Sequence, residues 1–311
     1  MLIMNIKTFI SALEVVSPAT SKLAKFKYSA NGRVLQFDHV LIEQPLQIRL
    51  LWQEPNSVTS FSRVFSITMR TPGDDQALIV GLMQSEGIIE HYHQLESVKP
   101  ETDAHNAKLL SDNGGENQWA VKLIAGVVPD IKSLERFQVT YSSCGLCGTT
   151  SLKSLDMKNP PALNNEPHWL GFTTVCAMPN MMRKVQSQFT ETGGSHAAAL
   201  FDQQGQLVDI KEDIGRHNAL DKLFGASLGI RDIRHSQYCV LVSGRISFEI
   251  VQKTIMAGIA VLIAVGAPSE LAILAAKRFD LTLIGFTNKT GFNLYYGDWR
   301  LMPLEEVCQK T

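Results

Sequence analysis

The strongest constraint on the fold lies beyond about Leu170, where short apolar runs alternate with amphipathic stretches. Apolar runs of this kind between amphipathic helices are typical of strands in a sheet that helices cover on both faces. We therefore predict an α/β layered domain over residues 170–311. The expected helices span 179–189, 247–258 and 269–279, with another beginning near Gly215, and the expected strands span 197–202, 206–211, 238–242, 261–265 and 281–285.

The first half of the chain has a mixed pattern. β-rich runs at 46–50 and 64–69 predict two strands. Apolar residues at helical spacing after Thr71 predict a helix that ends at Gly87. We therefore interpret residues 31–157 as a smaller α+β lobe that ends in a cysteine-containing loop.

Two segments flank this lobe. Residues 1–30 have little periodicity, and we interpret them as a mobile N-terminal arm. Residues 158–169 are rich in proline and asparagine, which break regular structure, and are expected to connect the two lobes.

Charge and hydropathy argue against two classes of partner. The net charge is −1, and no excess of Lys and Arg indicates a surface for nucleic acid or an anionic membrane. The longest apolar run, residues 257–267, is too short to span a bilayer. The sequence predicts a soluble, cytoplasmic protein.

Small and polar residues directly follow three of the predicted strands, and such strand exits are where ligands bind in open α/β sheets. Here they let a ligand approach the backbone, and helix starts direct unpaired N–H groups at it, which together favour a nucleotide or another phosphorylated ligand. Singly, Ser243 or Ser269 would be read as a helix N-cap. The common nucleotide fingerprints are absent from the sequence. The exits are Ser243-Gly244-Arg245, Gly266-Ala267-Pro268-Ser269 and Phe286-Thr287-Asn288-Lys289-Thr290-Gly291.

Two further clusters are candidates for the same crevice. Gly193, Gly194 and His196 precede a predicted strand. Arg216 and His217 stand at the start of a predicted helix, where positive charge is unfavourable unless an anion or a carboxylate compensates. Asp213 is near enough in sequence to be that carboxylate. A satisfied structural network is the alternative reading of both clusters.

Cys144 and Cys147 form a C-x-x-C pair in the stretch SSCGLCGTT, within a chain of five cysteines. A structural zinc site needs a second pair of ligands, and a zinc deaminase needs H-x-E, which none of the eight histidines provides. Glycine follows each cysteine and favours a flexible loop over a helix start. Such a loop suits a thiol that carries sulfur as a persulfide, although a disulfide or redox role remains open.

Several long motifs together resemble the FdhD family, the formate dehydrogenase accessory sulfurtransferases. The likeness runs in order from about Val40 to Tyr296, and its length and number of motifs make it highly specific. The motifs are SSCGLCG, TPGDDQALIVGLMQSEGII, FTETGGSHAAALFD, EDIGRHNALDKLFG, VLVSGRISFEIVQKTIMAGI and LTLIGFTNKTGFNLYYG.

The resemblance implies a function that the residues alone do not name. Such proteins take sulfur from a cysteine desulfurase and pass it to the bis-molybdopterin guanine dinucleotide form of the molybdenum cofactor, which then enters formate dehydrogenase. By position, Cys144 would hold the persulfide and Cys147 would assist. The strand exits and the two further clusters would bind the cofactor. The predicted binding residues are Gly193, Gly194, His196, Arg216, His217, Ser243, Gly244, Arg245, Phe286, Thr287, Asn288, Lys289, Thr290 and Gly291.

The same resemblance carries expectations about architecture. It implies a cytidine deaminase-like, three-layer α/β/α large domain, a homodimer and no permanently bound metal. The chain departs from the family pattern at Gly266, where the family often has Ser, and over Thr287–Thr290, where it often has Arg or Gly. The ammonium group of Lys289 cannot make the bidentate contact with a phosphate that an arginine makes. These departures therefore concern the affinity for the cofactor. The rival interpretation is a non-catalytic chaperone that binds the cofactor, with the cysteines as a redox-sensitive latch.

Overall fold

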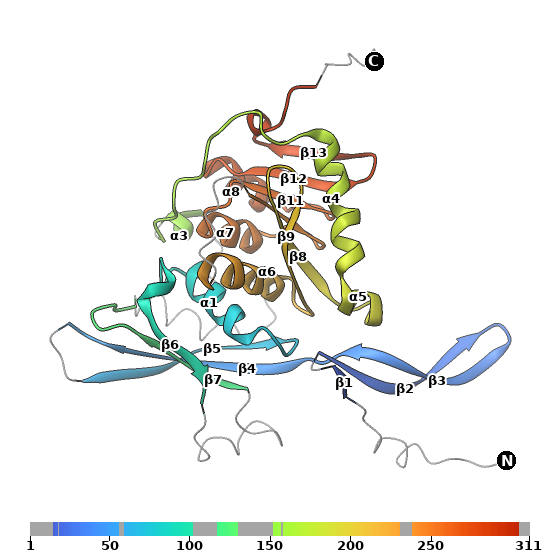
Figure 1. The fold of residues 1–311 in the computed structure, drawn as a ribbon, viewed down its shortest axis with the longest axis horizontal. Helices are drawn as coiled ribbons and strands as arrows, with labels where there is room; N and C mark the ends of the chain where they lie inside the picture. The colour runs from blue at the N-terminus through green and yellow to red at the C-terminus, as the bar shows by residue number, and fades with distance from the viewer. Residues whose placement is uncertain are drawn as a thin grey trace.

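A computed structural model describes residues 15–17, 19–55, 59–101, 117–129, 152–156, 158–230 and 238–304 (Figure 1). Cys144 and Cys147, and with them the predicted sulfur-carrying loop, lie outside the described residues. Within the described residues, no helix is long and apolar enough to cross a membrane.

A six-stranded sheet forms the centre of the larger lobe, in the order β13-β12-β11-β10-β8-β9. The middle strands β10, β11 and β12 are parallel, and the strands on either side are antiparallel to their neighbours. The predicted strands are confirmed, but the last one continues through Phe286 and turns back into a strand that the sequence did not predict. The strands are β8 (His196–Phe201), β9 (Leu207–Asp213), β10 (Cys239–Val242), β11 (Val261–Ala264), β12 (Thr282–Asn288) and β13 (Gly291–Tyr296).

Helices cover both faces of this sheet, so the predicted three-layer α/β/α arrangement is confirmed (Figure 1). One apolar core lies between the sheet and α6 (Arg216–Phe224), α7 (Phe248–Met256) and α8 (Glu270–Arg278). A second core lies between the other face and α4 (Phe172–Val185).

Helix α4 begins earlier than the predicted helix over 179–189. Its buried side chains Val175, Met178 and Met182 recur every three or four residues and start before Pro179. Burial of this stripe therefore extends the helix through a proline that the sequence placed at its first turn. The chain then continues as a separate short helix, α5 (Ser187–Thr192).

The smaller lobe is a four-stranded sheet in the order β5-β4-β7-β6, with one helix, α1 (Asp75–Ser85), on one face. Alternate residues of β4 are buried beneath that helix, as expected for a sheet with one covered face. The predicted helix end is confirmed, because Gly87 adopts a left-handed φ of +74° that favours glycine. The strands are β4 (Gln44–Gln53), β5 (Ser60–Arg70), β6 (Leu95–Pro100) and β7 (Gln118–Leu123).

Helices α1 and α6 pack directly against each other and join the two lobes. Two glycines allow the close approach. A β-carbon on Gly81 would lie 2.0 Å from the carbonyl oxygen of Asp221, and one on Gly225 would lie 1.8 Å from that of Ala77. The two helix backbones are therefore in contact at this crossing.

A ribbon of β2 (Thr20–Ser29) and β3 (Gly32–Leu41) extends away from the body, and the short strand β1 (Val15–Ser17) pairs with the start of β2 (Figure 1). Residues 20–29 are thus a strand rather than the mobile arm predicted for residues 1–30. Ser29 pairs with Gly32 across a two-residue turn, where Gly32 has a φ of +112°. This tight turn and the cross-strand pairs favour a hairpin that the weak periodicity did not reveal.

Candidate functional site

The three predicted strand exits meet at one edge of the six-stranded sheet. The backbone N–H of Gly266 donates to the carbonyl oxygen of Gly244 over 3.3 Å, and that of Phe286 donates to Gly266 over 3.1 Å. A β-carbon on Gly266 would lie only 2.7 Å from the Gly244 oxygen. Glycine at position 266 therefore lets neighbouring exits pack backbone to backbone, which gives a physical reason for its departure from serine.

Ser243 and Ser269, each of which could be a helix N-cap, have different roles at their two exits. Ser269 is the N-cap of α8, since its hydroxyl accepts from the backbone N–H of Ala272 over 3.3 Å. The hydroxyl of Ser243 instead accepts from the backbone N–H of Ala197 in β8 over 2.9 Å. Ser243 therefore ties β10 to β8 and fixes the position of the next residue, Gly244.

His196 and Arg216 belong to the same edge as Gly244. A β-carbon on Gly244 would lie 3.4 Å from Nδ1 of His196 and 3.7 Å from Cδ of Arg216. Gly193 and Gly194 end α5 just before His196, and Gly193 adopts a φ of +69°. The structure thus places His196 and Arg216, one residue from each predicted cluster, beside the first strand exit.

This edge is electropositive. Burial lowers the pKa of His196, and the nearby guanidinium groups of Arg216 and Arg245 lower it further. Arg245 is exposed, whereas Nε of Arg216 is buried and has no hydrogen-bond partner among the described residues. A buried N–H without a hydrogen-bond partner lowers the stability of the fold. An anion that accepted a hydrogen bond from this Nε would remove that cost.

The third exit adds an aromatic ring and a second buried polar atom. Phe286 is 48% exposed and has a φ of +54°, a strained value for a bulky residue. Thr287 is buried, and its hydroxyl has no partner among the described residues. Asn288 closes the following turn by accepting from the N–H of Thr290 over 2.9 Å. Lys289 is exposed in that turn, and no described contact links Lys289, Thr290 or Gly291 to the other two strand exits.

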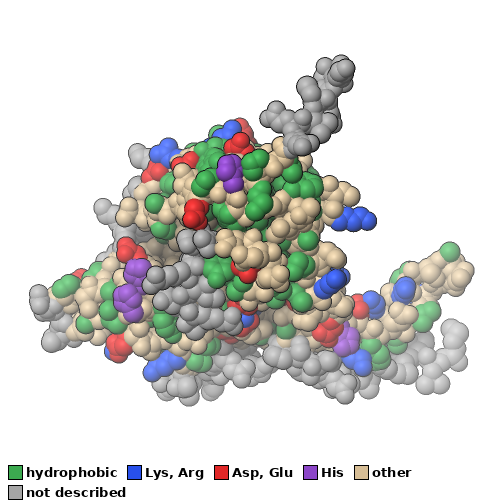
Figure 2. Space-filling view, turned by 45° about the horizontal axis from the view of Figure 1, so that its top comes forward, with side chains coloured by type: hydrophobic (Ala, Val, Ile, Leu, Met, Phe, Trp, Pro, Cys, Tyr) green, Lys and Arg blue, Asp and Glu red, His purple; other side chains and the backbone are tan. Residues whose placement is uncertain are grey.

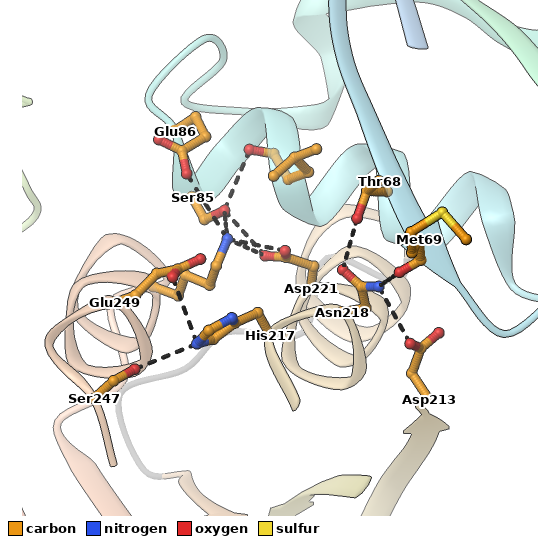
Figure 3. Close-up of polar contacts among 12 residues, drawn as sticks. Thr68, Met69, Ser85, Glu86, Asp213, His217, Asn218, Asp221, Ser247 and Glu249 are labelled. Atoms are coloured by element: carbon orange, nitrogen blue, oxygen red, sulfur yellow. Dashed lines mark hydrogen bonds and ion pairs between the residues drawn. The ribbon is translucent and has the colours of Figure 1, made fainter. Parts of the chain in front are cut away.

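His217 points toward Ser247 and Glu249 at the start of α7 (Figure 3). Its Nε2 lies 3.3 Å from the hydroxyl of Ser247 and 3.5 Å from Oε2 of Glu249. Both neighbours contact the same ring nitrogen, so the three side chains do not form a relay in which an acid orients the base. His217 therefore contacts the start of α7, two residues after the first strand exit ends at Arg245.

The predicted role of Asp213 as the carboxylate that compensates Arg216 and His217 is wrong. Asp213 is fully buried, and its oxygens bind Nζ of Lys222 at 2.8 Å and the backbone N–H of Thr71 at 3.1 Å. It also accepts from the N–H of Gly215 and from Asn218, whose amide donates to Met69 (Figure 3). Asp213 thus fastens α6 to the smaller lobe, and Glu249 is the carboxylate nearest His217.

A second buried network was missed by the sequence analysis. Nζ of Lys253 in α7 binds both oxygens of Asp221 in α6, at 3.0 and 2.9 Å, and the hydroxyl of Ser85 in α1 at 3.1 Å (Figure 3). Burial opposes its charge, but the carboxylates of Asp221 and Glu86 raise the pKa of Lys253 above its ordinary value. This ion pair links three helices below the site, and nothing in the local sequence identified the partners.

The environment of His217 predicts a stability that depends on pH. Burial and the charges of Arg216 and Lys253 lower the pKa of His217 from 6.5 to about 3. As the pH falls below 6.5, the unfolded chain binds a proton that the folded chain does not, so the free energy of unfolding falls by up to ~1.4 kcal/mol per pH unit.

We expect His217→Gln to have a flatter pH profile than the wild type between pH 6.5 and 4 in urea unfolding. His93→Gln, at an exposed histidine, is the control and should follow the wild type. Parallel profiles for the wild type and His217→Gln would contradict an imidazole that stays neutral in the folded chain.

The described residues contain no group of three or more His, Cys, Asp or Glu side chains placed to hold a metal ion. The sheet edge instead gathers the guanidinium groups of Arg216 and Arg245 and the hydroxyl of Thr287, which suit an anionic ligand.

Comparison with known proteins assigns the chain to a family. A family model described as the FdhD/NarQ family matches residues 43–302, which is most of the chain. The chain belongs to the FdhD/NarQ family. Among its relatives, a protein named sulfur carrier protein FdhD from Streptomyces avermitilis is 42% identical over 272 residues, covering 85% of this chain and 89% of the relative. A protein of the same name from Saccharolobus solfataricus is 38% identical over 259 residues, covering 83% and 89%.

A solved structure supports the fold of this FdhD/NarQ chain. It is described as that of a formate dehydrogenase accessory protein from Desulfotalea psychrophila, and it matches with a TM-score of 0.67 at 21% identity. The match covers 92% of this chain and all of the other. The mixed α/β fold predicted from the sequence is confirmed, while its likeness to cytidine deaminases remains a prediction.

Proposed function

We propose that this protein is a sulfur carrier that serves formate dehydrogenase in the cytoplasm. The names of its relatives support a sulfur carrier role. The thiolate of Cys144 attacks the outer sulfur of a persulfide on a cysteine desulfurase, the donor's S–S bond breaks, and the donor leaves as a thiolate while Cys144 becomes a persulfide. Cys147 assists by shielding or releasing that sulfur.

We further propose that the acceptor is the bis-molybdopterin guanine dinucleotide molybdenum cofactor, which binds as a substrate rather than as a resident group. The single observation that carries this proposal is the electropositive sheet edge, where Nε of Arg216 is buried without a partner in the described residues. Arg245 offers a second cation, and Gly244, which has no side chain, lets a pyrophosphate approach beside His196 and Arg216.

The exposed ring of Phe286 offers a flat apolar surface to a guanine base. The buried hydroxyl of Thr287 lies next to it in sequence and is available as a polar partner. Lys289 contributes at most a distant point charge from its exposed turn. We therefore place the cofactor's phosphates near Arg216 and one of its bases near Phe286.

Calorimetric titration with GDP, which stands in for one end of the cofactor, tests the binding site. Arg245→Ala and Arg216→Ala should each weaken GDP binding by about 1–3 kcal/mol, because each removes a charge-assisted hydrogen bond. Arg278→Ala is the control, since Arg278 lies at the other end of α8 from the strand exits and pairs with Asp156. Unchanged GDP affinity in both site variants would remove this edge from the binding site.

A further inference from the structure

His196 stands beside the room that Gly244 leaves at the first strand exit. It is the first residue of β8, which pairs with β10, the strand that leads into that exit. A β-carbon on Gly244 would lie 3.4 Å from Nδ1 and 3.5 Å from Cε1 of the imidazole. A ligand that packs against Gly244 therefore comes into contact with the Nδ1 edge of this ring.

Two guanidinium groups from other elements act on the same imidazole. Arg216 comes from the start of α6, and Arg245 follows Gly244 in the exit. Burial lowers the pKa of His196 below its ordinary value of 6.5, and the charges of Arg216 and then Arg245 lower it further. A charge on His196 would also act on His217, the next residue of α6. In the free protein the ring of His196 is therefore mostly neutral at pH 7.

The two carboxylates next to His196 in the sheet are bound to other groups. Asp213 pairs with His196 across β8 and β9 and raises its pKa, but less than the other influences lower it. The carboxylate of Asp213 binds Nζ of Lys222 at 2.8 Å. Glu212 accepts from the hydroxyl of Ser195 over 2.6 Å and from backbone N–H groups at the start of α5. Positive charge at this edge is therefore left for a ligand to balance.

The protein as a whole gives an anion little attraction. Its net charge is −1. On the face drawn in Figure 2, the Lys and Arg side chains are scattered over the surface and interspersed with Asp and Glu. The pyrophosphate of the proposed cofactor carries a negative charge on each phosphate. Its binding therefore depends on the cations that stand directly at the sheet edge.

We propose that His196 takes up a proton when the pyrophosphate of the cofactor binds, and so becomes a third cation beside Arg216 and Arg245. The bound anion offsets the repulsion from the two guanidinium groups and accepts a charge-assisted hydrogen bond from the protonated ring. Without ligand, the neutral ring spares the edge a third adjacent positive charge. This inference rests on the proposed function, because it requires the pyrophosphate to bind at this edge.

The coupling between the proton and the ligand has a definite sign. The pKa of His196 lies below 6.5 in the free protein and rises in the complex, so the complex holds more protons at neutral pH. Ligand affinity therefore increases as the pH falls through the pKa of the complex toward that of the free protein. We expect the affinity for GDP to rise about twofold or more between pH 8 and pH 7.

Calorimetric titration with GDP at pH 7 in PIPES, HEPES and Tris measures the proton directly, because the binding enthalpy changes with the ionisation enthalpy of the buffer. The wild type should take up about half a proton or more per GDP bound. His196→Asn keeps an amide near the position of Nδ1 but cannot titrate. Its proton uptake should be smaller by that amount, and its affinity should not rise between pH 8 and pH 7. The difference between the two proteins cancels the terminal phosphate of GDP, which itself titrates near about pH 6.

His93→Gln, at an exposed histidine of the smaller lobe, is the control and should match the wild type. Circular dichroism verifies that His196→Asn is folded, and His196→Gln takes its place if it is not. Proton uptake that is unchanged in the His196 variant overturns the inference, because the proton then goes to another group. A wild type that binds GDP without proton uptake also overturns it but leaves the proposed binding site standing. A wild type that does not bind GDP overturns both.

Discussion

Replacing Gly225 by alanine is expected to destabilise the protein by more than about 4 kcal/mol or to prevent folding. The added β-carbon would lie 1.8 Å from the carbonyl oxygen of Ala77 and 2.7 Å from the backbone nitrogen of Gly81. Both obstacles are backbone atoms of α1, so no side-chain rotation relieves the clash, and α1 and α6 must move apart. Separation would also strain the buried ion pair between Asp221 and Lys253.

Urea unfolding of the purified variant measures this effect, and the yield of soluble protein reports it if folding fails. Gly291→Ala is the matched control, because a β-carbon there meets nothing within 4 Å. We expect the control to change the free energy of unfolding by less than about 0.5 kcal/mol. A Gly225→Ala protein whose free energy of unfolding stays within about 1 kcal/mol of the wild type would contradict the direct contact of the two helices.

Replacing Cys144 by alanine is expected to abolish the activity of formate dehydrogenase produced beside the variant. The change removes the proposed sulfur-carrying atom, so no persulfide forms, while GDP binding at the sheet edge survives because Arg216 and Arg245 are untouched. This combination separates the sulfur carrier from the rival chaperone with a redox latch. Under the rival interpretation, the dehydrogenase made with Cys144→Ala stays active.

Cys176→Ala provides the control for loss of a thiol elsewhere. Cys176 is buried in α4, and burial raises the pKa of its thiol, which makes it a poor nucleophile. Formate dehydrogenase activity should therefore be retained with Cys176→Ala. If Cys176→Ala lowered formate dehydrogenase activity as much as Cys144→Ala does, the assay would be responding to folding rather than to sulfur transfer.

The sequence predicted the architecture of the larger lobe because that architecture depends on local periodicity. Apolar strand runs and amphipathic helices follow one another in the chain, and parallel strands bring their exits to one edge. The meeting of Gly244, Gly266 and Phe286 could therefore be expected from the pattern alone. The glycine-mediated contact between two exits could not, since it depends on how closely neighbouring backbones pack.

The errors arose where the partner of a residue is far away in sequence. The sequence analysis paired Asp213 with its neighbours Arg216 and His217. Asp213 instead binds Thr71 in the smaller lobe and Lys222 in the last turn of α6. Lys253 and Asp221 likewise meet only when α6 and α7 pack. Long-range burial decides such pairs, and a single sequence holds no signal for it.

The most direct test of the central claim is mass spectrometry of the protein after incubation with a cysteine desulfurase and cysteine. The account predicts one added sulfur atom on the peptide that contains Cys144, with transfer to Cys147 as the only further position, and no addition in Cys144→Ala. Sulfur found instead on Cys176, Cys239 or Cys308, or on no cysteine at all, would contradict a sulfur carrier whose reactive thiol is Cys144.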